Sequence, residues 1–302
     1  MREKNKLRDA IKNLYKPYRY TINGNTTILE TTSGKFIAKE KTDVDIKGIY
    51  NYLLSRNFDN FPALVDGDRT PLNVFEYVES IPTPREQKAV DLINVVATLH
   101  NKTTYHKEVS EDKYKEIYEN ITNNLVYLEE FYNNLFSKIT TQVYMSPSNY
   151  LLIRNSTMIL SAIDFCKREL DIWYKLVKEK KKQRVAVIHN NLASDHLIKG
   201  MRDYLVSWDK SKIDSPVMDL INFYKNDYYE LDFETLFDQY LQGFPLLEDE
   251  QKLFFIVLSI PPEIEDATSE FRWAMNTQKC LDYVYKTESL IRPYYTTQKE
   301  EE

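Results

Sequence analysis

Side chains that can take part in chemistry gather in one stretch of the sequence, residues 187–220. The apolar runs Val187-Ile188 and Tyr204–Val206 flank a polar loop, and more acidic residues follow the second run. Imidazoles and carboxylates are the usual proton carriers of enzymes, and carboxylate and amide oxygens are common metal ligands. The candidate functional residues of this stretch are His189, Asn191, Asp195, His196, Ser207, Asp209, Asp214 and Asp219.

A second candidate lies near the amino terminus, at Lys39. The run Phe36–Lys39 is typical of a strand, in which Ile37 and Lys39 point to the same face because side chains alternate. An apolar surface beside an ammonium group is what a nucleotide base and its phosphates need. An edge-strand lysine in solvent would give the same local pattern, so the elements around Lys39 must decide between the two interpretations.

Those elements predict a small antiparallel sheet. The pairs Asn23-Gly24 and Ser33-Gly34 are turn signals between runs of strand-forming residues. A short amphipathic helix over 7–15 is expected before them, and a helix over 43–54 after them. The first lobe is therefore predicted as five antiparallel strands and one main helix, with strands over 18–22, 26–31, 35–41, 61–65 and 72–77.

Helical periodicity dominates after the rigid, proline-containing connector at 80–84. We predict an α+β fold with an N-lobe at 1–79, which holds the sheet, and a mainly helical C-lobe at 80–302. His106 falls in a predicted loop. The basic run 178–184 is interpreted as a solvated helix end, with a docking patch for an acidic partner as the alternative. Helical patterns are expected over 90–100, 114–139, 156–182, 233–243, 253–258 and 271–284.

The composition narrows the function classes. The 302 residues carry a formal net charge of -6, which argues against a general nucleic-acid binder. Two cysteines, Cys166 and Cys280, are too few for a disulfide framework. No secretory signal follows Met1, and no apolar run reaches the roughly 18–20 residues that a membrane span needs. We therefore predict a cytoplasmic protein without a membrane or nucleic-acid partner.

The layout resembles the aminoglycoside phosphotransferases and the spore-coat-kinase-like branch of the protein-kinase fold. That family carries a His-x-Asp loop with an Asn five residues after the Asp, then an Ile-Asp-Phe or Ile-Asp-Trp element, then Gly-Asp-Pro and Asp-Leu. Here His189 fits the first histidine and Val206-Ser207-Trp208 fits the second element. Asp214-Ser215-Pro216 and Asp219-Leu220 follow in the same order. The resemblance implies a two-lobed, protein-kinase-like α+β fold.

The resemblance also implies a cofactor, ATP with Mg²⁺, and residues that bind it. Lys39 matches the lysine that contacts the phosphates. Glu76, Tyr77 and Val78 fall where the family binds adenine through backbone groups. In the family an acid on the next helix pairs with the lysine, but the helix predicted over 43–54 carries acids only at its start.

Three positions depart from the family pattern. Asn191 stands where the base belongs, and His196 and Ser207 stand at the two metal-ligand positions. An amide cannot accept the proton as a carboxylate can, and such help is worth roughly 10²–10⁴-fold. Magnesium prefers carboxylate oxygens, and imidazole suits softer metals. Asp209 and Asp195 are the candidate replacement carboxylates.

Three functions fit these substitutions. The leading hypothesis is a catalytically impaired pseudokinase that binds a nucleotide or a partner, with His189 bracing the loop and Asp214 and Asp219 in structural roles. The alternative is an active ATP-dependent phosphotransferase on a small-molecule hydroxyl that uses Asp209 or Asp195. The third is a structural or assembly protein, for instance of a spore layer.

Overall fold

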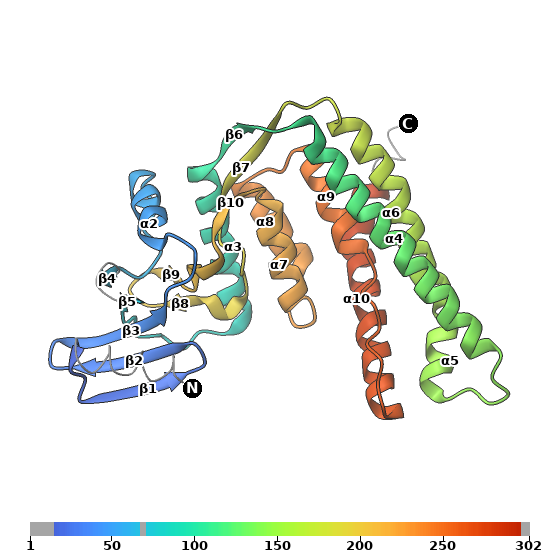
Figure 1. Cartoon of the computed structure of the whole chain (residues 1–302), viewed down its shortest axis with the longest axis horizontal. Helices are drawn as coiled ribbons and strands as arrows, with labels where there is room; N and C mark the ends of the chain where they lie inside the picture. Colours follow the sequence, from blue (N-terminus) through green and yellow to red (C-terminus); the bar gives the residue numbers. More distant parts are fainter. Residues whose placement is uncertain (1–14, 67–70, 297–302) are drawn as a thin grey trace. The chain divides into compact units, whose positions relative to one another are not determined.

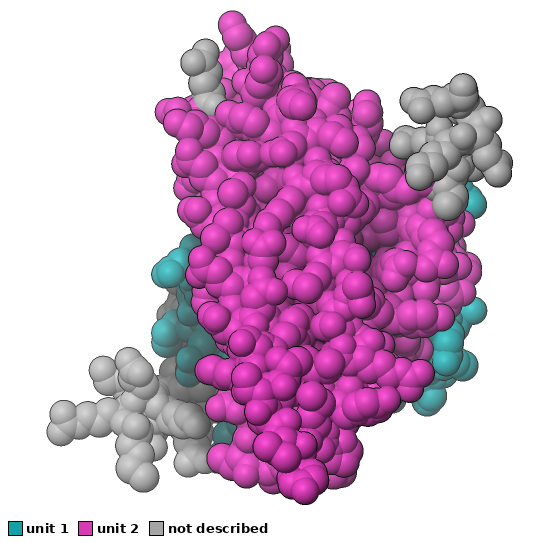
Figure 2. Space-filling view, turned by 90° about the vertical axis from the view of Figure 1, so that its right-hand side faces the viewer, with its two compact units in different colours: residues 1–104, 186–214, 242–244 teal, residues 105–185, 215–241, 245–302 magenta. Residues whose placement is uncertain are grey.

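The computed structural model describes residues 15–66 and 71–296 (Figure 1). The predicted helix over 7–15 lies outside them except for its last residue. The chain forms two compact units, coloured in Figure 2: unit 1 holds residues 1–104, 186–214 and 242–244, and unit 2 holds 105–185, 215–241 and 245–302. The functional stretch up to Asp214 and the predicted sheet thus belong to one unit. The lobe boundary near residue 79 stays a prediction.

Unit 1 contains the predicted five-stranded antiparallel sheet, with the strand order β1-β2-β3-β5-β4. Gly24 closes the β1–β2 hairpin at φ +57°, a left-handed value that glycine adopts readily. Gly34 opens β3 at φ +129° after the second turn. The strands are β1 (Arg19–Asn23), β2 (Thr26–Thr31), β3 (Gly34–Glu40), β4 (Leu64–Asp66) and β5 (Leu72–Glu76).

The helix between β3 and β4, α2 (Ile46–Ser55), begins three residues later than predicted. The reason is its cap: the Asp45 carboxylate accepts a hydrogen bond of 3.0 Å from the Gly48 backbone N–H. The face of α2 with Ile46, Tyr50 and Leu53 is buried, as its periodicity predicts.

An aromatic cluster in unit 1 packs α2 against the functional stretch. The indole of Trp208 is 2% exposed and meets the Tyr50 ring edge-on, with 6.1 Å between the ring centroids. Its Nε1 donates a hydrogen bond of 2.7 Å to the Leu205 carbonyl. Phe58 and Phe61 contact the same indole at about the same distance. These contacts fix where the chain after Val206 lies relative to the sheet.

Helix α3 and several short strands complete unit 1. Strands β8 and β9 pair with each other, and β10 pairs with the last residues of β7. The Leu205 N–H donates to the Asn60 carbonyl over 2.9 Å, which joins β9 to the loop before β4. The elements are α3 (Arg85–Thr103), β7 (Lys182–Ile188), of which the first four residues belong to unit 2, β8 (Leu197–Lys199), β9 (Asp203–Leu205) and β10 (Lys212–Asp214).

Unit 2 is built mainly from helices around one apolar core. Long helices α4, α6 and α10 supply much of it, including Tyr132, Trp173 and Leu281. In the described part of the chain, no helix combines the length and hydropathy needed to cross a membrane. The helices are α4 (Glu111–Thr140), α5 (Pro147–Arg154), α6 (Ser156–Val177), α7 (Val217–Asp227), α8 (Phe233–Gly243), of which the last two residues belong to unit 1, α9 (Glu248–Ser259) and α10 (Glu270–Thr296).

Two sequence predictions in unit 2 are wrong. The helix expected over 156–182 ends at Val177, because strand β7 begins at Lys182. His106 lies not in a loop but in β6 (Tyr105–Glu108), which pairs with β7. All four residues of β6 are exposed, so this strand lacks the apolar alternation by which a strand is detected.

The aromatic cluster predicts a stability effect. Trp208→Ala should lower the free energy of unfolding by about 3–5 kcal/mol, because it removes a buried indole and leaves a cavity. Urea unfolding followed by circular dichroism measures this. Tyr144→Ala is the control: Tyr144 is 91% exposed, so its change should stay within about 0.5 kcal/mol. A loss below about 1 kcal/mol for Trp208→Ala would contradict the role given to the cluster.

Candidate functional site

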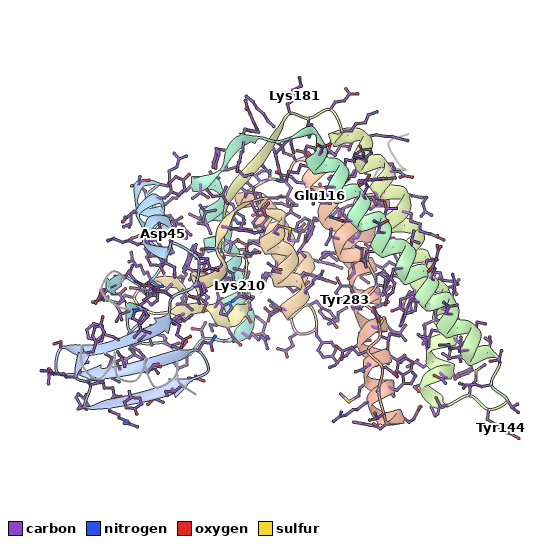
Figure 3. The ribbon with its side chains drawn as sticks, in the orientation of Figure 1. Asp45, Glu116, Tyr144, Lys181, Lys210 and Tyr283 are labelled. Atoms are coloured by element: carbon purple, nitrogen blue, oxygen red, sulfur yellow. The ribbon has the colours of Figure 1, made fainter. Side chains whose placement is uncertain are left out.

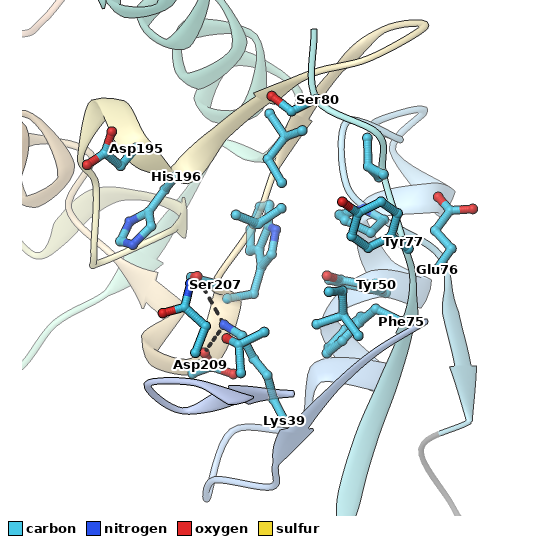
Figure 4. Close-up of a pocket in the computed structure, with 18 residues that line it drawn as sticks. Lys39, Tyr50, Phe75, Glu76, Tyr77, Ser80, Asp195, His196, Ser207 and Asp209 are labelled. Atoms are coloured by element: carbon cyan, nitrogen blue, oxygen red, sulfur yellow. Dashed lines mark hydrogen bonds and ion pairs between the residues drawn. The ribbon is translucent and has the colours of Figure 1, made fainter. Parts of the chain in front are cut away.

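A cavity of about 500 Å³ opens in unit 1 between the sheet and the functional stretch (Figure 4). Small-molecule sites usually measure roughly 300–1,000 Å³ and combine apolar walls with a few polar groups. This cavity has both. Its apolar walls come from β3, β5, β8 and the residues after β9, and include Ile37, Phe75, Val78, Ile198 and Val206. Its charged and polar groups include Lys39, Glu76, Asp195, His196, Ser207 and Asp209.

Lys39 reaches into the cavity and is held by two oxygen atoms. Its Nζ donates hydrogen bonds of 3.0 Å to Ser207 Oγ and of 3.0 Å to Asp209 Oδ2 (Figure 4). The side chains of Lys39 and Asp209 are 15% and 27% exposed, so the ion pair is partly shielded from water. The acid that pairs with Lys39 therefore comes from the functional stretch and not from α2. The sequence analysis named Asp209 only as a replacement carboxylate and did not foresee this pairing.

The backbone at Ser207 makes that contact geometry possible. Ser207 adopts the left-handed conformation, φ 70° and ψ 48°, and the chain then turns into a short 3₁₀-helix, Trp208–Lys210. Ser207 and Asp209 do not lie in a strand, because β9 has already ended at Leu205. Both side chains nevertheless meet Lys39, since the tight turn carries Asp209 back toward Ser207.

His189 stabilises the loop through two contacts of its ring. Its ring is fully buried, and Nε2 donates a hydrogen bond of 2.7 Å to the Val206 carbonyl oxygen. The ring also packs edge-on against Trp208, with 5.2 Å between the centroids. His189 thus connects the end of β7 with the residue before Ser207, which is a positioning contact.

His196 and Asn191 are joined within the loop. His196 Nδ1 donates to the Asn191 backbone carbonyl over 2.5 Å, while His196 lines the cavity. The Asn191 side chain does not line it. Its Oδ1 accepts a hydrogen bond of 3.4 Å from Lys210 Nζ. The residue predicted at the base position is thus an amide beside a cation.

The remaining acids of the stretch lie in different surroundings. Asp195 lines the cavity but does not contact Lys39. Asp214, in β10, forms an ion pair of 2.7 Å with Lys212. Asp219 belongs to unit 2, where it is fully buried in the first turn of α7. The N-cap position of that helix is Pro216, so Asp219 lies inside the helix and is not its cap.

Glu76, Tyr77 and Val78 all line the cavity, as their predicted role requires of them. The Glu76 carboxylate accepts a hydrogen bond of 2.9 Å from the Ala63 N–H, which fixes the end of β5 against the neighbouring segment. Lys35 Nζ lies 5.4 Å from the centroid of the Tyr77 ring, a cation–π distance.

Tyr50 is a cavity residue that the sequence analysis missed. It was assigned to the buried face of a helix, and that assignment is right, but its ring also lines the cavity. Burial, followed by the negative charges of Asp209 and Glu76, raises the pKa of Tyr50 far above its ordinary value. The phenol therefore stays neutral at physiological pH. Only the helical periodicity marked this residue, and periodicity carries no sign of a cavity.

The donor set fits magnesium poorly. Among the described residues, no group of three or more His, Cys, Asp and Glu side chains is placed to hold a metal ion. Of the residues considered for the metal, only Asp209 and Asp195 are carboxylates, and Asp209 already pairs with Lys39. Mg²⁺ binds through carboxylate and phosphate oxygens in a strict octahedral geometry. No catalytic step is therefore assigned to a metal at this site.

Comparisons with known proteins place the fold. No protein-family model matches the chain, and no curated protein matches it. Its structure is similar to that of an aminoglycoside phosphotransferase from Alicyclobacillus acidocaldarius, with a TM-score of 0.65, 9% sequence identity and coverage of 95% of this chain and 93% of the other. A spectinomycin phosphotransferase crystallised with ADP and spectinomycin has a TM-score of 0.50, 11% identity and coverage of 94% and 98%.

These similarities define the class: the chain has the protein-kinase-like α+β fold of small-molecule phosphotransferases. The predicted fold class is confirmed. At such low identity the likeness extends to the fold and not to the activity, so the residues of the cavity must carry any argument about function.

The loop contacts predict a stability effect at His189. His189→Ala should lower the free energy of unfolding by about 2–4 kcal/mol, because it leaves the Val206 carbonyl without its donor and opens a gap beside Trp208. Chemical unfolding of the full chain measures this. His106→Ala, at an exposed position of β6, is the matched control and should change little. Equal effects of the two substitutions would contradict the bracing role.

Proposed function

We propose that this chain is a kinase-fold protein that binds a nucleotide, ATP in the first place, in the unit 1 cavity and is impaired in phosphoryl transfer. The observation that carries the proposal is the state of Lys39. Its ammonium lies in an apolar-walled cavity, where Asp209 pairs with its charge and Ser207 accepts a second hydrogen bond. The cavity thus offers a cation for phosphates, while the two predicted metal positions, His196 and Ser207, carry no carboxylate.

The walls of the cavity support the nucleotide part of the proposal. Apolar side chains from β3 and β8, Ile37 and Ile198, can pack against the faces of a base. Glu76, Tyr77 and Val78 can offer backbone groups to its edge, which is the role expected of them. The ligand would be a nucleotide because a single cavity combines these surfaces with a lysine.

The catalytic positions support the impaired part. Asn191 cannot act as a base, and the loss of general-base help costs roughly 10²–10⁴-fold. Phosphoryl transfer depends mostly on neutralising the charge of the transferred group, and the metal positions, His196 and Ser207, carry no carboxylate. Both deficits act on the same step.

Thermal unfolding with ATP tests the proposal. ATP should raise the midpoint equally in EDTA and in Mg²⁺, because the binding free energy comes from Lys39 and the walls of the cavity. Lys39→Ala should weaken ATP binding roughly 10- to 100-fold, the range of a lost charge-assisted contact. Lys41→Ala, two residues further along and outside the cavity lining, is the matched control and should bind as the natural chain does.

The possible outcomes separate the hypotheses. Stabilisation that requires Mg²⁺, together with Mg²⁺-dependent ATP consumption lost in Lys39→Ala, would overturn the impaired reading. No stabilisation under either condition would favour the structural or assembly role.

A second candidate function is an active ATP-dependent phosphotransferase acting on a small-molecule hydroxyl. One observation favours it: the Asp209 carboxylate lies in the cavity, 3.0 Å from Lys39 Nζ, where it could exchange the lysine for a metal ion. Two further carboxylates, Glu76 and Asp195, line the cavity, and Asp195 makes no contact with Lys39.

Substitution of Asp209 separates the two candidates. If the chain is an active enzyme that uses Asp209, Asp209→Ala abolishes ATP turnover while Asp195→Ala leaves much of it. If the chain only binds nucleotide, Asp209→Asn tightens ATP binding in EDTA by several-fold, because it frees Lys39 and removes a negative charge near the phosphates. Calorimetric titration and a turnover assay on the same variants give both readouts.

A further inference from the structure

Unit 2 contains a separate cavity of about 230 Å³, lined from the antiparallel β6–β7 pair and from helices α4, α6 and α9. None of its residues lines the nucleotide cavity. One lining side chain has an unsatisfied polar group. Tyr114 is 4% exposed, and its hydroxyl has no hydrogen-bond partner in the part of the chain that the structure describes. Buried phenols usually find a partner, so the group calls for an explanation.

The carboxylates of this cavity are already neutralised. Asp249 pairs with Lys180, with 2.8 Å between Oδ1 and Nζ. Glu250 forms a two-point contact with the Arg184 guanidinium, through Nε at 2.9 Å and through Nη2. The Leu247 N–H donates to the same carboxylate over 3.0 Å. These acids are therefore satisfied acceptors and do not make the cavity a cation site.

Other donors remain. In the β6–β7 pair His106 is opposite Arg184, and Lys182 is two residues from Arg184 along β7, so the side chains of all three share one face. All three line the cavity. Within the described chain neither the His106 side chain nor the Lys182 side chain has a hydrogen-bond or ion-pair partner, and Glu108, opposite Lys182, makes no ion pair with it. The lysine and arginine side chains of the lining outnumber its carboxylates by three to two.

The state of the Tyr114 hydroxyl is consistent with a donor. Burial, helped by the charges of Asp249 and Glu250, raises the pKa of Tyr114 to about 12. The phenol thus keeps its proton at physiological pH and can donate it in a hydrogen bond to an acceptor inside the cavity. Trp173, Leu247 and Leu253 give the same cavity an apolar wall.

We propose that this cavity binds a small oxyanion, a carboxylate or phosphate on a compact apolar body. The Tyr114 hydroxyl donates to one oxygen, Lys182 neutralises the charge, and the apolar wall covers the rest of the ligand. The volume limits the ligand to a molecule smaller than a nucleotide, since drug-sized ligands occupy roughly 300–1,000 Å³. The site is independent of the proposed nucleotide site, because the two share no residue.

Calorimetric titration of the full chain in EDTA and without nucleotide tests the proposal, with inorganic phosphate and sodium benzoate as separate probes. We expect saturable binding of at least one probe, weakened roughly five- to tenfold by Tyr114→Phe and by Lys182→Gln. Saturation by benzoate assigns a carboxylate on an apolar body, and saturation by phosphate assigns a phosphate group.

The chain offers matched controls. Tyr118→Phe removes a hydroxyl from the same helix that already donates to Asp171, and Lys181→Gln removes the neighbouring charge at the turn after α6 (Figure 3). Both should leave binding unchanged. Tyr114→Phe removes a hydroxyl that has no partner, so its thermal midpoint should not fall, and lost binding will not reflect unfolding.

Phosphate could also bind beside Lys39, and a further variant separates the two sites. Binding that survives Lys39→Ala and is weakened in Tyr114→Phe supports the cavity, whatever the fate of the nucleotide proposal. Two outcomes would overturn the inference and leave a water-filled cavity only. One is binding that is lost in Lys39→Ala and kept in Tyr114→Phe. The other is no saturable binding of either probe below about 10 mM, a binding free energy of about 3 kcal/mol.

Discussion

The ion pair between Lys39 and Asp209 is the interaction on which the unit 1 cavity depends. An ammonium group in an apolar-walled cavity is costly unless an opposite charge lies close to it. The helix that follows β3 offers no acid within its length, so the partner must come from elsewhere in the chain. The functional stretch provides it, and the Ser207 hydroxyl supplies a second acceptor. The contact therefore also ties the sheet to the loop.

Holding Asp209 in place requires a shaped backbone and a rigid support. The left-handed turn at Ser207 directs the short 3₁₀-helix back toward β3, and the buried Trp208 anchors that helix. His189 fixes the residue before the turn through its hydrogen bond to Val206. A strained conformation of a residue other than glycine persists only where its surroundings over-determine it. Here the aromatic cluster and the histidine do so, and together they hold the turn that brings Ser207 and Asp209 to Lys39.

The sequence predicted those parts that follow local rules. Glycine turns and alternating strands gave the sheet, and helical periodicity gave most of unit 2. The resemblance to a known family brought Lys39, Ser207 and Asp209 into one hypothesis, but it did not pair them, because the pairing joins residues about 170 positions apart through a backbone turn. Strand β6 was not predicted, because all its side chains are exposed and it lacks apolar alternation. Tyr50 and Tyr114 looked like ordinary core residues, since a cavity leaves no mark on helical periodicity.

The left-handed backbone of Ser207 also determines which side chains this turn can hold. Aspartate and asparagine enter that region of conformational space several times more often than other residues with a side chain. An aspartate at position 207 would therefore meet no new backbone cost, and the turn is already built for it. The turn at position 207 would therefore accept a carboxylate side chain beside Lys39 without refolding of the loop.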